Sequence, residues 1–481
     1  MSIRVAESAE APSFQKAALP LLQDVQLGKN VRHATEVIQR KRAAMVAETR
    51  DWQELRDAAS AIKAHTMRHL DEYLTQFEQA CTAAGGQVHW ASDADEANAI
   101  ITALVKRAGG NEVIKIKTMT SDETGLNEAL EHAGIRAYET DLAELIVQLG
   151  HDKPSHIVVP ALHKNRSQVR DIFRAQMNLP ELGDRPEDLT AAARDYLREK
   201  FLRVPVGVCG ANFLVGETGG VCIVESEGNG RMCLTLPNTL IALAGIEKVI
   251  PRFQDLEVLL QLLPRSATGE RMNPYNSLWT GVRAGDGPQE FHVVLLDNGR
   301  TRMLADAEAR QTLHCIRCAA CLNACPVYRQ TGGHAYGSSN AGPIGAIVTP
   351  QLLNMEHAQT LPFASSLCGA CYEVCPVKIN IPEVLIHLRG RVVQEQKSAL
   401  DAEKLAMKIA AAIFTSRARY EAAQRLARKA QVPLVRRGWV KNLPGLLGNW
   451  TRVRDLRALP QQTFREWWRE REKRTGSASR G

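Results

Sequence analysis

Seven of the eleven cysteines of this chain lie close together, between positions 315 and 375. They form the two motifs Cys315-x-x-Cys318-x-x-Cys321-x-x-x-Cys325-Pro326 and Cys368-x-x-Cys371-x-x-x-Cys375-Pro376. Cysteine thiolates hold iron–sulfur clusters, and two-residue gaps let one tight turn direct three sulfurs at the same cluster. We therefore predict two iron–sulfur clusters, whose chemistry is the transfer of single electrons.

The proline after the last cysteine of each motif helps to assign the ligands. In two-cluster ferredoxins, the fourth cysteine of such a run, followed by proline, ligates the other cluster. On that rule the first site is a complete [4Fe–4S] cluster, whereas the second site has three thiols. The predicted ligands are Cys315, Cys318, Cys321 and Cys375 for the first site, and Cys325, Cys368 and Cys371 for the second.

The second site lacks one thiolate, because Ser365 stands where a complete motif has cysteine. Three arrangements are open: a [3Fe–4S] cluster, a [4Fe–4S] cluster with Ser365 or solvent as fourth ligand, or a cluster that loses iron easily. Paired C-x-x-C motifs also bind zinc. Zinc ribbons, however, do not use two runs that each end in Cys-Pro, so the spacing favours iron–sulfur chemistry.

Charge is distributed unevenly over the 481 residues, whose net charge is +7. From Ile386 onward there are 22 Lys+Arg against 8 Asp+Glu, an excess of 14 that leaves −7 for the rest of the chain. This tail also holds four of the seven tryptophans. Arginine with tryptophan suits a partner interface or peripheral contact with an anionic membrane. Helices packed on the protein's own acidic body fit as well, and nothing besides charge points to nucleic acid.

Targeting signals and cysteine usage both bear on where the protein is located. The first residues lack the apolar core of a secretion signal, and no apolar run reaches the 18 residues that a membrane span needs. We therefore expect a cytoplasmic protein. Four cysteines lie outside the motifs: Cys81, Cys209, Cys222 and Cys233. The last three fall in strand patterns and are expected to be buried small hydrophobic residues, and such a distribution does not suggest a disulfide scaffold.

Short β-branched runs alternate with helical stretches from about residue 70 to 300, which predicts an α/β domain with a parallel or mixed sheet. His156–Pro160 and Met232–Leu236 are predicted strands, Thr239–Ala244 a helix, and the glycine-rich stretch Gln330–Thr349 a loop. The expected parts are a helical N-terminal extension (1–70), the α/β domain (71–303), the cysteine module (304–385), and a basic helical C-terminal region (386–481).

The α/β domain contains a second candidate site. Glu217 lies among glycines, in a turn where it is a candidate general base or nucleophile; the competing interpretation is that it caps the turn. Asn212, Asn229 and Arg231 are candidates to complete a carboxylate-binding pocket. No phosphate-binding loop or dinucleotide fingerprint is present, so ATP, NAD or flavin is not indicated. Two histidines are candidates to tune a cluster by hydrogen bonding; they are His314 and His334.

The order of these parts resembles the lactate utilization protein B family of bacterial L-lactate oxidation systems. The resemblance covers nearly the whole chain. Besides the cysteine motifs, it rests on Gly207–Glu217, Glu227–Arg231, Gly245–Val249, Glu290–Arg300 and Thr463-Phe464-Arg465.

The resemblance implies an α/β domain of the LUD type, akin to isomerases and CoA-transferases, an α-helical dicluster ferredoxin domain and a family-specific C-terminal region. It also implies two partners: a cysteine-rich subunit like those of heterodisulfide reductase and a second LUD-domain protein. The expected function is that of an iron–sulfur electron-transfer subunit in the oxidation of L-lactate to pyruvate. The alternatives are a catalytic subunit whose α/β domain transforms a 2-hydroxy acid or acyl substrate, and a redox-sensing or assembly protein.

Overall fold

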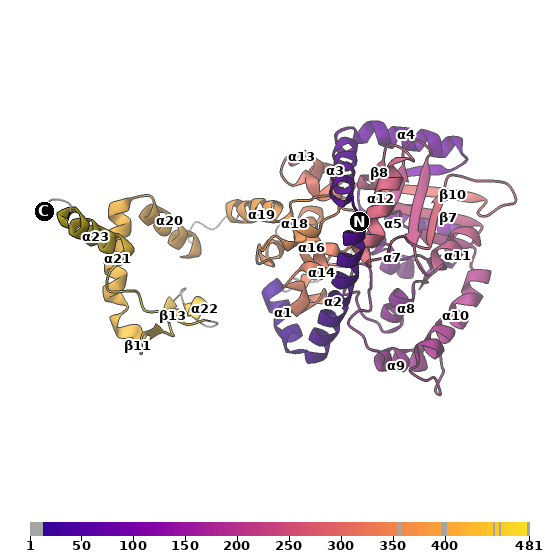
Figure 1. The fold of residues 1–481 in the computed structure, drawn as a ribbon. Helices are drawn as coiled ribbons and strands as arrows, with labels where there is room; N and C mark the ends of the chain where they lie inside the picture. Colours follow the sequence, from indigo (N-terminus) through magenta and orange to yellow (C-terminus); the bar gives the residue numbers. More distant parts are fainter. Residues whose placement is uncertain (1–12, 354–357, 396–401, 446–447, 452–453, 479–481) are drawn as a thin grey trace. The chain divides into compact units, whose positions relative to one another are not determined.

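The computed structural model describes residues 13–353, 358–395, 402–445, 448–451 and 454–478. It divides into two units, 1–393 and 394–481, and each is described here by itself. The first unit contains the α/β domain and the cysteine module (Figure 1). Both candidate sites therefore belong to one unit.

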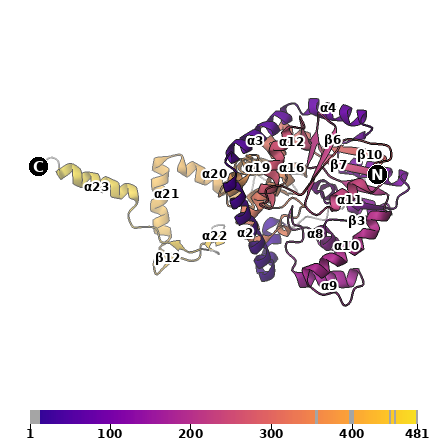
Figure 2. The same ribbon diagram turned by 45° about the vertical axis from the view of Figure 1, so that its right-hand side comes forward.

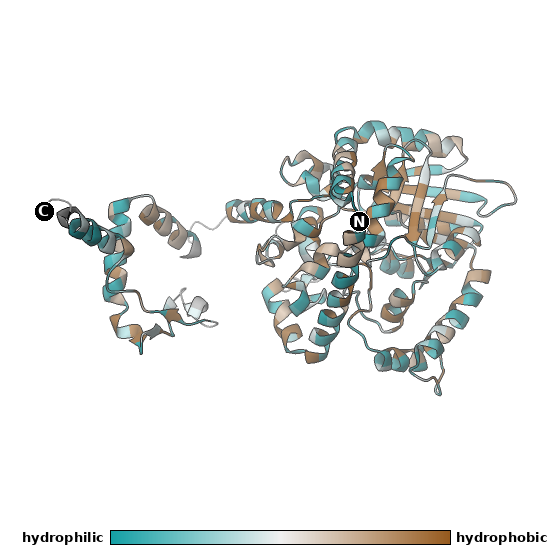
Figure 3. Ribbon diagram, in the orientation of Figure 1, coloured by the Kyte–Doolittle hydropathy of each residue, from teal (hydrophilic) through white to brown (hydrophobic). Residues whose placement is uncertain are grey.

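A six-stranded sheet, parallel throughout, forms the centre of the α/β domain. Its strands are, in spatial order, β1 (Gln87–Ala91), β10 (Glu290–Leu296), β7 (Thr239–Gly245), β4 (Val206–Cys209), β2 (Glu112–Lys115) and β3 (Arg136–Glu139). Strand β7 is apolar after Thr239 and β10 is apolar after His292, as expected where helices cover both faces of a parallel sheet. Brown segments mark apolar residues among the strands in the hydropathy view (Figure 3).

A smaller mixed sheet packs beside the first. Its strands are β8 (Val249–Ile250), β5 (Phe213–Val215), β6 (Gly220–Glu225) and β9 (Tyr275–Trp279). β5 pairs with β8 in parallel, whereas β6 is antiparallel to both β5 and β9. The prediction of an α/β domain is thus confirmed, with the parallel and mixed pairings in separate sheets.

Helices connect and cover these strands (Figures 1 and 2). In the α/β domain they are α5 (Ala94–Arg107), α6 (Met119–Thr124), α7 (Leu126–His132), α8 (Leu142–Leu149), α9 (Arg166–Gln176), α10 (Pro186–Arg203), α11 (Asn229–Thr235) and α12 (Asp255–Ala267). In the cysteine module they are α13 (Arg300–Ala305), α14 (Ala320–Ala324), α15 (Tyr328–Thr331), α16 (Gly342–Leu352), α18 (Ala370–Val374) and α19 (Ile381–Glu395).

Four described helices precede strand β1, and the first three of them complete the core of the cysteine module. The four are α1 (Phe14–Gln23), α2 (Val25–Glu48), α3 (Trp52–Arg68) and α4 (Leu70–Ala83). Helix α2 packs against α12, α14 and α15, and α3 packs against α12. Apolar residues of α1–α3 and of the cysteine module belong to one continuous hydrophobic cluster. The N-terminal helices therefore support the module far along the sequence.

Two predicted elements of the α/β domain were wrong. Thr239–Ala244, predicted as a helix, is the buried strand β7. A short continuous apolar run fits either element, and here the sheet neighbours decide. Met232–Leu236, predicted as a strand, falls largely in helix α11, because the Glu225 carboxylate accepts the N–H groups of Gly228 and Gly230 at the start of that helix.

Two further local predictions also need correction. His156–Pro160 is not a strand, because Nδ1 of His156 accepts the N–H groups of Val158 and Val159 and bends the chain. The stretch predicted as a loop at 330–349 contains most of helix α16. Every residue of α16 is buried, and Pro343 lies in its first turn, where proline is tolerated.

The described part of the C-terminal unit contains helices and a small antiparallel sheet. Its helices are α20 (Ala402–Phe414), α21 (Arg417–Ala430), α22 (Gly448–Thr451) and α23 (Phe464–Ala478), and its strands are β11 (Val435–Arg436), β12 (Trp439–Val440) and β13 (Leu456–Arg457). Arg428 on α21 makes a two-pronged ion pair with Glu466 on α23. Among the described residues, no helix is both long and apolar enough to cross a membrane.

Candidate functional site

The four predicted ligands of the first cysteine site line one cavity in the structure. They are Cys315, Cys318, Cys321 and Cys375. Cys315 and Cys318 lie in the turn between residue 314 and helix α14, Cys321 lies in the first turn of α14, and Cys375 directly follows α18. Arg317 and Ala319 in this turn have φ angles of 61° and 60°, a left-handed conformation that is strained for residues with a Cβ. Strain of this kind concentrates at functional sites.

Burial shapes the chemistry of these thiols. It raises the pKa of Cys318 to about 12 and that of Cys375 to about 11. Thiolates in this cavity therefore need a bound cation, and the irons of a cluster held by these cysteines would supply that charge. Backbone N–H groups also donate to the sulfurs, from Arg317 to Cys315 at 3.4 Å and from Ile379 to Cys375 at 3.3 Å. Such hydrogen bonds to sulfur tune the potential of a cluster.

The separation of the sulfurs fits a cluster better than a zinc ion. In the part of the chain that the structure describes, no three of the seven motif thiols lie within 4.8 Å of one another. Zn–S bonds of ~2.3 Å in a tetrahedron would place the sulfurs about 3.8 Å apart. A cluster of four irons separates its ligands further than one zinc ion does, so thiols that do not gather within 4.8 Å are compatible with a cluster.

The second cysteine site is more open. Cys325 and Cys371 are buried, whereas Cys368 is exposed. Burial raises the pKa of Cys371 to about 12, and the nearby charges of Cys325 and Cys368 add to that effect, so the three sulfurs are neighbours. Ser365 is half-buried, and its hydroxyl accepts the N–H of Leu367 at 3.1 Å.

Two arginines from the N-terminal helices hold the segment that carries Cys375. Arg56 on α3 donates to the carbonyl of Cys375 at 2.9 Å and to that of Tyr372 at 3.3 Å. Arg42 on α2 donates to the carbonyl of Val374 at 3.0 Å. These contacts could not be predicted from the sequence, because the two segments lie more than 300 residues apart.

A group of buried charges lies beside the first cysteine site. Lys63 donates to the carbonyl of Glu247 at 2.5 Å. Arg300 makes two bonds of 2.9 Å with Glu123 and a further bond with Glu247. Burial lowers the pKa of Lys63 and of Lys248 to about 8. Glu247 and Lys248 belong to the stretch Gly245–Val249, and Arg300 ends the stretch Glu290–Arg300; both stretches carry the family resemblance in the sequence.

Glu217 lies in a separate cavity of about 720 Å³, together with His65, Tyr73 and Arg252. Its side chain is exposed, and its carboxylate accepts the N–H of Phe253 at 2.9 Å. This contact is what a turn cap makes. None of the seven motif cysteines lines this cavity.

The cavity that contains Glu217 is not lined by the three other residues predicted for a carboxylate-binding pocket. Asn212 and Asn229 line another cavity, of about 350 Å³, together with Glu227. Arg231 lies outside it, with its guanidinium 5.5 Å from the centre of the Tyr275 ring. Burial raises the pKa of Glu227 to about 7, near the range of a proton acceptor.

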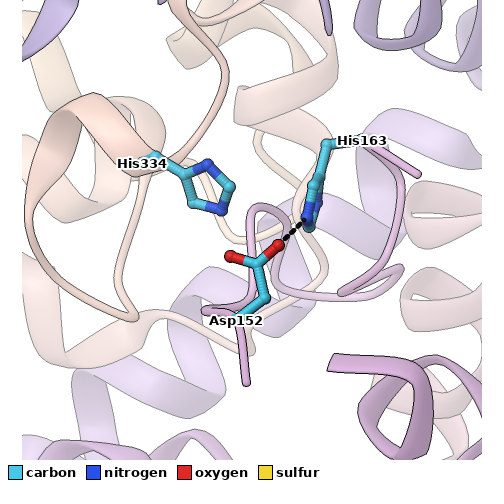
Figure 4. Close-up of side chains that lie close together, drawn as sticks. All are labelled: Asp152, His163 and His334. Atoms are coloured by element: carbon cyan, nitrogen blue, oxygen red, sulfur yellow. Dashed lines mark hydrogen bonds and ion pairs between the residues drawn. The ribbon is translucent and has the colours of Figure 1, made fainter. Parts of the chain in front are cut away.

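His334 does not bond to a cysteine but meets Asp152 and His163 (Figure 4). Its Nε2 lies 2.9 Å from the carbonyl of Lys153, and Nε2 of His163 lies 3.0 Å from Asp152. These three side chains are close enough to hold a metal ion. However, the Lys164 ammonium lies 2.5 Å from the same Asp152 oxygen and already neutralises it. Burial lowers the pKa of His314 to about 4, so that side chain is neutral.

Comparisons with known proteins agree with this arrangement. Residues 74–296 match the LUD domain, 311–379 the 4Fe-4S dicluster domain, and 387–473 the C-terminal region of lactate utilisation protein B. Together these matches define an iron–sulfur protein with an α/β LUD domain and a ferredoxin-type domain. A crystal structure of a DUF162 family protein from Deinococcus radiodurans has 13% identity and a TM-score of 0.27, too low to support an argument.

Full-length relatives identify the family. The lactate utilization protein B of Oceanobacillus iheyensis is 44% identical over 90% of this chain and 91% of its own length. Those of Shouchella clausii and Bacillus subtilis strain 168 are 43% and 42% identical, over 98% and 92% of this chain and 99% and 93% of their own. The chain belongs to the lactate utilization protein B family.

Proposed function

We propose that this protein is the iron–sulfur electron-transfer subunit of a system that oxidises L-lactate to pyruvate. The observation that carries the proposal is the convergence of four motif cysteines on one buried cavity within the 4Fe-4S dicluster domain. The names of the relatives supply the substrate. The α/β domain is then of the isomerase and CoA-transferase-like type.

Two clusters suit this reaction, because oxidation of a 2-hydroxy acid releases two electrons and each cluster carries one at a time. The first site would hold a [4Fe–4S] cluster, and the second a [4Fe–4S] or [3Fe–4S] cluster. The chain's own residues exclude water from the first site and direct N–H groups at its sulfurs. The exposed side of the second site, at Cys368, suits exchange of electrons with a partner.

The partners of the proposal are a cysteine-rich subunit like those of heterodisulfide reductase and a second LUD-domain protein. The test is anaerobic purification of the protein together with its partners, followed by addition of L-lactate. We expect bleaching of the visible cluster absorption and a reduced-cluster EPR signal with L-lactate but not with D-lactate. Dithionite-reducible clusters that stay oxidised with L-lactate in the complete complex would contradict the proposal.

A further inference from the structure

The six-stranded sheet has a topological switch point between β2 and β4. After β2 the chain continues to β3 at one edge, whereas after β4 the next strand of this sheet is β7, in the opposite direction. In open parallel sheets, ligands bind outside the carboxyl ends of the strands at such a point. The cavity of about 350 Å³ lies there, lined by residues that follow both strands, 116–120 and 210–212. Its volume is in the range of small-molecule sites, about 300–1,000 Å³.

Two cations line this cavity, and neither forms an ion pair among the described residues. A buried carboxylate that acts on both is Glu247, which is already bonded to Arg300. Lys248 is only 8% exposed, and within the described residues its ammonium has no hydrogen-bond or ion-pair partner. Arg317 lines the same cavity and donates to the amide oxygen of Asn340 at 2.7 Å, but no described carboxylate lies within ion-pair distance of it. Glu247 attracts the Lys248 ammonium but does not bond to it, and a buried ammonium without a hydrogen-bond partner is stabilised by an anion that bonds to it.

The acidic residues of the cavity wall already have partners. Glu123 pairs with Arg300 at 2.9 Å, and Glu225 accepts backbone N–H groups at the start of α11. Asp141 caps α8, and Glu227 accepts the N–H of Leu142 at 3.2 Å. None of these carboxylates forms an ion pair with Lys248 within the described part of the chain.

The cavity adjoins the first cysteine site. Arg317 lies between Cys315 and Cys318 in sequence, and it lines both this cavity and the one around the four thiols. We propose that the cavity at the switch point binds a small carboxylate anion of the 2-hydroxy-acid or 2-oxo-acid class, held by Lys248 and Arg317. The acid class rests on the proposed function, whereas binding of a carboxylate rests on the two cations alone.

Lys248 also has a competing role, because its charge could offset that of an occupied first site. Binding measurements separate the two roles. The probes are L-lactate, pyruvate and the neutral lactamide, titrated calorimetrically into the anaerobically purified full chain. We expect both acids to bind and lactamide to bind at least tenfold more weakly. Lys248→Met should weaken binding of the acids at least tenfold, and Lys248→Arg should restore most of it.

The matched control is Lys106→Met, at an exposed position of α5, which should bind like the unmodified protein. Methionine replaces a buried, unpaired ammonium with an apolar chain of similar length, so the fold and iron content should persist. Equal binding of the acids by Lys248→Met, or equal binding of lactamide, would overturn the inference. A different result is that the full chain binds both acids but L-lactate does not reduce its clusters in the complete complex. That result would contradict the proposed function and the choice of acid, but not the binding of a carboxylate in this cavity.

Discussion

The two cysteine sites come from similar motifs but lie in different surroundings. At the first site four thiols line one cavity, and Cys318, Cys321 and Cys375 are at most 9% exposed. At the second site Cys368 is exposed, and Ser365 stands in the fourth position. The N-terminal helices hold the first site through backbone carbonyls. The first site is therefore closed and the second is open at Cys368, and on the proposed function the open site is the one expected to exchange electrons.

The largest effect is expected from removing a ligand of the closed site. Cys321→Ala should remove roughly half of the bound iron and lower the stability of the whole first unit, because cluster binding is coupled to folding. Iron analysis and thermal unfolding measure both. Cys222→Ala, at a buried cysteine of β6 outside the motifs, is the control and should keep all its iron. Equal iron content in the two variants would break the assignment of Cys321.

A smaller loss of stability is expected from removing an arginine that supports the first cysteine site. Arg56→Met leaves the carbonyls of Cys375 and Tyr372 without their side-chain donor and should lower the free energy of unfolding by about 2 kcal/mol. The first cluster should then bleach faster in air than the second. Arg68→Met, at an exposed position on the same helix, should change neither property. If the second cluster bleached faster than the first in Arg56→Met, the arginine would not support the first site.

Acid should destabilise the contact between the α/β domain and the cysteine module. Nε2 of His156 lies 3.1 Å from the amide oxygen of Asn323, between Cys321 and Cys325, and burial lowers the histidine pKa to about 4. An unfolded histidine takes up its proton near pH 6.5, so this stability is complete above that pH and falls as the pH drops toward 4. Between pH 7.5 and 5.5 we expect a loss of about 1 kcal/mol.

Chemical unfolding of the unmodified protein and of His156→Gln at both pH values isolates this contribution. Glutamine cannot titrate, so the variant should show a pH dependence smaller by that amount, although it is less stable at neutral pH. The same pH dependence in both proteins would show that His156 is already charged in the folded state or exposed to water.

The open site offers a substitution with little effect on stability. Ser365→Cys supplies the fourth thiol, and we expect it to slow the loss of iron in air and to abolish any oxidised three-iron EPR signal. Ser366→Cys, at the exposed neighbouring position, is the matched control. Should both variants behave like the unmodified protein, residue 365 does not face the second cluster.

The smallest effect is expected at Glu217. Glu217→Gln keeps an oxygen to accept the N–H of Phe253, so lactate-dependent cluster reduction should change less than twofold. A loss of turnover of more than tenfold with normal iron content would show that the α/β domain is itself catalytic at this residue. The cavity around Glu217, rather than either cysteine site, would then be the place where the reaction occurs.

Sequence reasoning succeeded where chemistry is local. The spacing of the cysteines and their Cys-Pro endings indicated which thiols belong together, and alternating β-branched runs indicated the α/β class. It failed where position depends on tertiary structure. The apolar run at Thr239–Ala244 fits a helix or a strand, and only its neighbours in the sheet decide. Lys248 and Arg317 are distant in sequence and meet only because the switch point lies beside the cysteine module.

The most direct test of two unequal iron–sulfur sites is iron and sulfide analysis with EPR on the anaerobically purified full chain. Spectra are recorded as isolated, after brief exposure to air, and after reduction with dithionite. We expect about seven to eight irons per chain, with air removing signal from the second site before the first. Bound zinc without an EPR signal, or two clusters that decay together, would contradict the account.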